Sequence, residues 1–185
     1  MHEKKCLLIV DLQNDFCAGG ALAVPDADSI VATINQIMDK FDLILASRDM
    51  HPQHSAHFLS WPVHCIRGTH GAEFHPDLNT LGIHFFLEKG TSSKDNGYSV
   101  FESTTFNLNE LLHKYGITSL YVCGLATDFC VKATVLDALR YGFPTFLITD
   151  CIRAVNQHPD DGARALEEMK RSGAQLIDSQ AILPK

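Results

Sequence analysis

The sequence predicts an α/β fold, a three-layer sandwich in which a mostly parallel six-stranded sheet carries helices on both faces. Short apolar runs with the length of strands alternate with segments whose apolar residues recur at helical spacing. This alternation favours right-handed crossovers between parallel strands. The 185 residues, 45% of them hydrophobic, suffice for one sizeable core and are too few for two ordinary domains. We therefore expect a single domain over residues 1–185.

Six strands and four helices follow from the positions of the apolar runs and of the residues that cap helices. The fifth strand is expected to end at Asp150, and the sixth to lie at an edge of the sheet. The expected strands cover residues 6–10, 42–47, 84–89, 120–124, 143–150 and 174–178, and the expected helices begin near Asp26 or Asp28, Asn107 or Asn109, Thr127 and His158.

The charged residues argue against nucleic acids and anionic membranes as partners. The net charge is −7, and no run of basic residues is longer than Lys4-Lys5. The apolar run before Asp11 is too short for a signal peptide or a membrane span. We expect a cytoplasmic protein that acts on a small molecule. The sequence leaves open whether it is a monomer or a homo-oligomer.

Asp11 comes directly after the first strand, and Phe16 follows five residues later. Ligands of open α/β sheets bind at the carboxyl ends of the strands, so a carboxylate and an aromatic ring should lie beside the crevice. Taken alone, Asp11 is explained equally well as a cap of the next turn.

Asp49 and His51 follow the second strand with one residue between them, and two further histidines of the next loop, His57 and His64, lie close in sequence. In an extended segment residues i and i+2 point the same way, so the carboxylate and imidazole of this pair should meet. Imidazole and carboxylate without thiolate suit zinc, iron(II) or manganese. Each histidine taken singly is more often a surface residue than a ligand.

Lys89 ends the third strand, and Cys130 lies in the first turn of the helix that begins near Thr127. A buried lysine needs a carboxylate partner, and Asp11 is the obvious one, although a solvated lysine before a turn is the commoner case. The helix N-terminus favours ionisation of the Cys130 thiol, which makes it the candidate nucleophile. A small buried core cysteine is the competing explanation.

The remaining loops and cysteines are less informative. Residues 66–83 should form a loop with one short helical turn that leaves His70 and His75 at the surface, and residues 91–106 should cover part of the crevice. Six cysteines fit no CxxC pattern and are expected to be free thiols.

Together, the motifs resemble those of nicotinamidases within the isochorismatase-like cysteine hydrolase superfamily. They run in order along nearly the whole chain: IVDLQNDFCAGGALAV, ASRDMHP, SWPVHC, GTHGAEFHP, EKG, VCGLATDFCVKATVLDA and LITD. The resemblance implies six strands in the order 3-2-1-4-5-6. It also implies hydrolysis of nicotinamide to nicotinate and ammonia through a thioester on cysteine, with pyrazinamide as a second substrate.

The resemblance also assigns roles to particular residues. It implies one divalent metal per chain, with zinc as the first choice and iron or manganese as the others. His57 is a position at which many members carry serine, and we expect this chain to use it as a fourth ligand. The implied sets are a catalytic triad of Asp11, Lys89 and Cys130, an oxyanion hole from the backbone N–H groups of Ala126 and Cys130 beside a cis peptide, aromatic walls from Phe16 and Trp61, and a metal site of Asp49, His51, His57 and His64.

Three alternatives compete with this interpretation. A related amidase acting on a carbamoyl compound or another small amide would share the triad and lack the metal cluster. A nucleotide-binding oxidoreductase would need a GxGxxG turn, whereas the turn after Val122 reads CGLATD. A non-catalytic metal-binding or redox protein would not need the intact triad.

Overall fold

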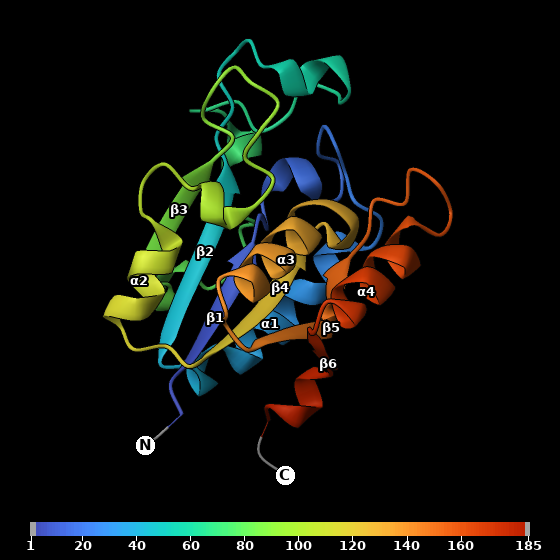
Figure 1. Ribbon diagram of the computed structural model, residues 1–185. Helices are drawn as coiled ribbons and strands as arrows, with labels where there is room; N and C mark the ends of the chain where they lie inside the picture. Colours follow the sequence, from blue (N-terminus) through green and yellow to red (C-terminus); the bar gives the residue numbers. More distant parts are fainter. Residues whose placement is uncertain (1–2, 184–185) are drawn as a thin grey trace.

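The computed structural model describes residues 3–183 and contains one six-stranded sheet whose paired strands are all parallel. The strand order is β3-β2-β1-β4-β5-β6, which confirms the predicted order and leaves β6 at an edge (Figure 1). The strands are β1 (Lys5–Val10), β2 (Leu43–Asp49), β3 (Phe85–Lys89), β4 (Ser119–Leu125), β5 (Thr145–Arg153) and β6 (Gln175–Ile177).

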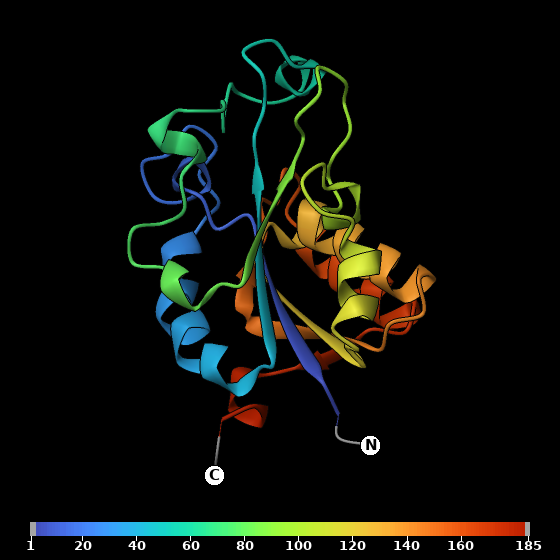
Figure 2. The same cartoon turned by 90° about the vertical axis from the view of Figure 1, so that its left-hand side faces the viewer.

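Helices cover both faces of the sheet, so the three-layer architecture is confirmed. Figure 2 shows α1 on one face and α2, α3 and α4 on the other. Asn107 caps α2, as expected, because its side chain accepts a hydrogen bond from the Glu110 N–H. The helices are α1 (Val31–Ile37), α2 (Leu108–Lys114), α3 (Lys132–Arg140) and α4 (Asp161–Arg171).

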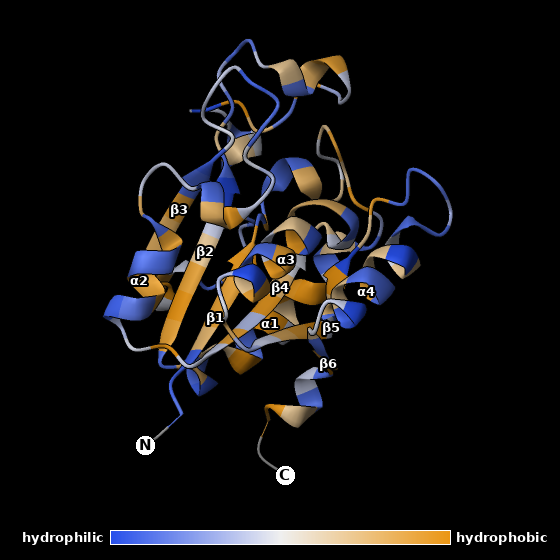
Figure 3. Ribbon diagram, in the orientation of Figure 1, coloured by the Kyte–Doolittle hydropathy of each residue, from blue (hydrophilic) through white to orange (hydrophobic). Residues whose placement is uncertain are grey.

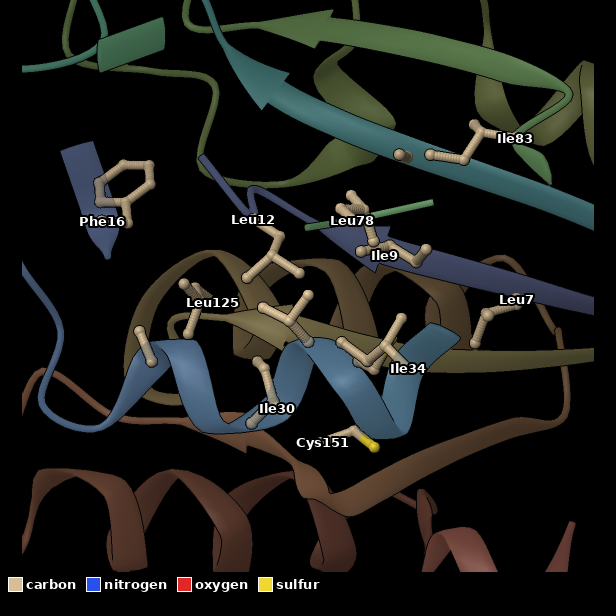
Figure 4. Packing of buried hydrophobic residues seen from close by; sticks show 14 of the residues in the cluster. Leu7, Ile9, Leu12, Phe16, Ile30, Ile34, Leu78, Ile83, Leu125 and Cys151 are labelled. Carbon is tan, nitrogen blue, oxygen red and sulfur yellow. The ribbon is translucent and has the colours of Figure 1, made fainter. Parts of the chain in front are cut away.

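Two apolar clusters separate the layers, because alternate residues of each strand point to opposite faces. On β1, Leu7 and Ile9 pack toward α1 and the turn before it, where Ile34 and Ile30 belong to the same cluster (Figure 4). The next residues along β1, such as Leu8, belong to the other cluster. The central strands are therefore largely apolar, whereas β2 and β3 turn polar at their carboxyl ends (Figure 3).

The fifth strand was predicted to end at Asp150, and this prediction is wrong, because β5 continues to Arg153. The pairing of β6 ends at Ile148, and beyond it both carboxylate oxygens of Asp150 accept hydrogen bonds from Ser179. A carboxylate inside a strand is tolerated here because these donors satisfy it. Asp150 is therefore not a residue of the crevice.

Among residues 3–183, no helix is long and apolar enough to cross a membrane.

Candidate active site

The carboxyl ends of β1, β2 and β3 bring three charged side chains into contact. The ammonium of Lys89 lies 2.7 Å from Oδ2 of Asp11 and 2.6 Å from Oδ1 of Asp49. It also lies 3.3 Å from the Cys130 sulfur and donates a hydrogen bond to the carbonyl of Gly97. The structure thus brings Asp11, Lys89 and Cys130 together, all in the protein interior.

The electrostatics of this group keep Lys89 charged and shift the pKa values of Asp11 and Asp49 in opposite directions. Burial lowers the pKa of Lys89, but Asp11 and Asp49 outweigh burial and raise that pKa well above its ordinary value. Burial raises the pKa of Asp11 above its usual range, although Lys89 opposes this. Burial also raises the pKa of Asp49, yet the Lys89 ammonium beside it opposes burial, and the net pKa is lowered. Asp11 is therefore the better proton acceptor of the two carboxylates.

Cys130 lies in a π-helical turn, Thr127–Val131, that joins β4 to α3. From the sequence, a helix N-terminus at this position predicts a stabilised thiolate. Instead, burial raises the pKa of Cys130 well above that of a free thiol, and Lys89 only partly offsets this. The expectation of an easily ionised thiol is wrong, because desolvation of the buried sulfur outweighs the stabilisation of its charge. A base is therefore needed to remove the thiol proton.

Asp49, His51 and His64 form a second group, whose donor atoms all lie within 4.8 Å of one another. The Nδ1 atoms of both histidines face backbone carbonyls, of Gly90 at 2.8 Å and of Pro62 at 2.7 Å. Because a carbonyl can only accept, Nδ1 carries the proton, and Nε2 presents a lone pair to the group.

The donor set of this group fits a divalent cation. Nε2 of His51 is buried without a hydrogen-bond partner and lies 3.6 Å from Oδ2 of Asp49. A cation between these two acceptors would satisfy both of them. Asp11, Asp49 and Lys89 together also leave one net negative charge at the site, which favours a cation.

His57 is not part of this three-residue group. Its ring lies 4.5 Å from that of His51, measured between centroids. Nε2 of His57 faces the carbonyl of Asn96 at 2.7 Å, and Nδ1 lies 3.5 Å from the carboxylate of Asp95. Its role as a fourth ligand stays a prediction.

A mostly apolar cavity opens above the charged group. Phe16 and Trp61, the two predicted aromatic walls, both line it, and Cys130 lies at its surface as well. The peptide bond between Leu125 and Ala126 is cis, and both residues line the same cavity. Sequence reasoning missed several lining residues, notably Leu22, Val24, Tyr98, Phe129 and Val155.

A model of the isochorismatase domain family matches residues 5–181. The chain belongs to the isochorismatase family. It is similar to the nicotinamidase of Escherichia coli, with 40% identity over 93% of each chain. It is also similar to two solved structures. One is the pyrazinamidase of Pyrococcus horikoshii in complex with zinc, with 39% identity, a TM-score of 0.85 and coverage of 95% of this chain and 99% of that one. The other is PnC1 from L. infantum in complex with nicotinate, with 34% identity, a TM-score of 0.90 and coverage of 96% and 94%.

In this isochorismatase-family chain, Ser47 and Gln13 support the charged groups, although sequence reasoning passed over both. The Ser47 hydroxyl donates to Oδ1 of Asp11 at 2.7 Å. The Gln13 amide accepts from the N–H of Asp49 and donates to its carbonyl. Strand periodicity could have found Ser47, because it precedes Asp49 by two residues within β2. It could not have found Gln13, because Asp11 has a φ of +47° and the chain is not extended between the two residues.

Cys17, Asp28 and His75 also place potential donor atoms within 4.8 Å of one another. The N–H of Asp77 donates to Nδ1 of His75, so the ring proton lies on Nε2 and is donated to Asp28. A hydrogen bond therefore occupies the place that a cation would take. His75 is held largely beneath the surface by this bond, contrary to the prediction, whereas His70 is exposed as expected.

Proposed function

We propose that this protein is a nicotinamidase, which hydrolyses nicotinamide to nicotinate and ammonia. The observation that carries the proposal is the contact of Lys89 with Asp11 and Cys130 at an apolar cavity that Phe16 and Trp61 line. The nicotinamidase and pyrazinamidase relatives support the same reaction. The chemistry is that of a small metabolic enzyme that supplies nicotinate for NAD salvage.

The first half-reaction begins with transfer of the Cys130 thiol proton to Asp11. The raised pKa of Asp11, which burial causes, suits this carboxylate to accept the proton. Lys89 remains an ammonium and stabilises the thiolate that forms 3.3 Å away. The sulfur then attacks the carboxamide carbon. The backbone N–H groups of Ala126 and Cys130 are proposed to stabilise the oxyanion, a contribution of about 3 kcal/mol for each donor.

The first half-reaction ends when Asp11 gives its proton to the departing amino group, which leaves as ammonia, and a thioester on Cys130 remains. The second half-reaction regenerates the enzyme. Water attacks the thioester carbon while Asp11 accepts a proton from it. The carbon–sulfur bond breaks, nicotinate leaves, and the Cys130 sulfur recovers the proton from Asp11. Asp11 thus transfers a proton in both directions, as microscopic reversibility requires.

We further propose that Asp49, His51 and His64 hold one divalent metal, with His57 as the fourth protein ligand. Zinc is the first choice, and iron(II) or manganese also suit these nitrogen and oxygen donors. When bound, the metal would supply a Lewis acid beside the cavity, at which a ring nitrogen or a water molecule can bind. The unpartnered Nε2 of His51 supports this assignment.

The substrate is proposed from the shape and chemistry of the cavity. Aromatic walls favour a planar ring, and Asp49 and His64 line the same cavity, so a metal held there would be open to a ring nitrogen. Pyrazinamide keeps the nitrogen meta to the amide and should be hydrolysed too. Benzamide keeps the ring and the amide but lacks the nitrogen, so we expect kcat/KM to be lower by about tenfold or more.

Ammonia release from nicotinamide, pyrazinamide and benzamide tests the proposal. The wild type should hydrolyse the first two, and Cys130→Ala should be inactive with a retained fold. Cys17→Ala is the matched control, because it removes a buried thiol that lies outside the triad, and it should remain active.

Three results would contradict parts of the proposal. Full activity in Cys130→Ala would exclude the thioester. Equal turnover of benzamide would exclude anchoring of the ring nitrogen. Preference for an aliphatic amide or a carbamoyl compound would assign the protein to a related reaction.

A further inference from the structure

Two loops meet at the mouth of the cavity. The histidine loop is residues 53–64, and the lysine loop is residues 90–99, which directly follow Lys89. They extend beyond the ends of β2 and β3 and run side by side in both ribbon views (Figures 1 and 2). The N–H of Ala56 donates to the carbonyl of Ser93 at 2.9 Å, which joins their backbones. Trp61 of the first loop and Tyr98 of the second both line the cavity.

Side chains of the two loops form one continuous polar chain. The indole N–H of Trp61 donates to the Tyr98 hydroxyl at 3.4 Å, and that hydroxyl donates to Oδ1 of Asp95 at 3.1 Å. The same Asp95 oxygen lies 3.5 Å from Nδ1 of His57. The Tyr98 ring also packs against the ring of His57, with 4.9 Å between their centroids.

This chain orients the indole ring of Trp61, one of the two aromatic walls of the cavity. Trp61 is only partly buried, and its ring meets Phe129 edge-on at a centroid distance of 4.8 Å. Among residues 3–183, its indole N–H has Tyr98 as its hydrogen-bond partner. A wall that is already ordered before the substrate arrives loses less conformational entropy on binding.

We propose that Tyr98 and Asp95 are positioning residues that hold Trp61 in place to stack on the substrate. The Tyr98 hydroxyl accepts a hydrogen bond from Trp61 and donates one to Asp95. Tyr98 and Asp95 would therefore affect the substrate through the position of the Trp61 ring. The inference rests on the proposed function for the identity of the substrate. The order of the wall itself belongs to the free protein.

Trp61 is the only tryptophan of the chain, so its fluorescence reports this wall alone. Tyr98→Phe removes the hydroxyl and keeps the ring. In the free protein this variant should show stronger acrylamide quenching of Trp61 and a red-shifted emission, and Asp95→Ala should act in the same direction. Tyr141→Phe, on an exposed ring outside the cavity, and Asp39→Ala, on an exposed carboxylate, are the matched controls and should match the wild type.

Steady-state kinetics give the second measurement. Tyr98→Phe should raise KM for nicotinamide about fivefold, the loss expected for one hydrogen bond, and change kcat by less than about twofold. The double variant Tyr98→Phe/Asp95→Ala should resemble the stronger single variant, because both residues belong to one chain of contacts.

Fluorescence of Tyr98→Phe identical to the wild type would overturn the inference, as would purely additive effects in the double variant. The fluorescence measurement needs no substrate. A wild-type protein that fails to hydrolyse nicotinamide therefore overturns the proposed function alone, and Trp61 quenching still decides the role of Tyr98.

Discussion

Lys89 is the residue on which the charge balance of the site depends. Its side chain is fully buried, and its ammonium contacts two carboxylates, a thiol and a backbone carbonyl. Without the lysine, two carboxylates would face each other in the interior, where like charges repel strongly. Stability and chemistry therefore depend on the same group.

Replacing Lys89 by Met should affect both properties. Removing one member of a buried ionic group costs roughly 3–5 kcal/mol of unfolding free energy, and loss of the charge that stabilises the thiolate should lower kcat/KM about a hundredfold or more. Lys132→Met is the matched control, because Lys132 forms a partly exposed pair with Glu168 and should change stability by less than about 1 kcal/mol. Urea denaturation and ammonia release measure both effects. A Lys89→Met protein as stable as the control would mean that the two carboxylates rearrange freely.

The sequence identifies these residues better than it identifies their energetics. The pairing of Lys89 with Asp11 was predicted from the need of a buried lysine for a carboxylate, and the structure confirms it. The contact with Asp49 was not predicted, because that carboxylate had been assigned to a metal. The pKa of Cys130 could not be predicted either, since the depth of burial that raises it depends on packing from distant segments.

At the scale of elements, the site depends on how closely β1 and β4 approach each other. Gly124 pairs with Val10 across these strands and has a φ of +106°. A Cβ atom on Gly124 would lie 2.1 Å from the carbonyl oxygen of Val10. Only glycine permits this approach, which places Asp11, after β1, close to Cys130, after β4.

Gly124→Ala should therefore destabilise the fold by about 4 kcal/mol or more, the sum of an unfavourable φ and a backbone clash. Gly142→Ala is the matched control: its φ is +84° and no atom lies within 4 Å of the added Cβ. The free energy of unfolding of the Gly142→Ala control should fall by only about 1–2 kcal/mol. Urea midpoints of the two variants provide the comparison. Equal losses would show that φ alone, and not the approach of the strands, requires glycine at position 124.

At the scale of the whole molecule, the layers could be predicted from the alternation of apolar runs and helical segments, and the strand order from the resemblance to a family whose motifs are spread along the chain. The end of β5 could not, because Asp150 is satisfied by Ser179, which lies 29 residues away in sequence. The contacts between the histidine and lysine loops also escaped prediction. The side chains that make such contacts follow no periodic pattern in the sequence. The path of each loop is set by the strands that it connects, so the sequence does not show which side chains will meet.

A cation that binds only the folded chain should stabilise the whole molecule. Zinc at a free concentration of about a hundred times its dissociation constant adds about 2.7 kcal/mol to the free energy of unfolding. For a domain of this size, that raises Tm by roughly 5–10 °C.

Chelator-treated protein should show this increase when zinc is added back. His64→Gln should lose most of it, because His64 contributes a lone pair to the group with Asp49 and His51. His70→Gln removes an exposed imidazole outside the group and should keep the full increase. Calorimetry with and without zinc makes the comparison. An equal increase in His64→Gln and the wild type would place the stabilising cation elsewhere, since a cation at this group cannot lose a ligand without losing affinity for the folded state.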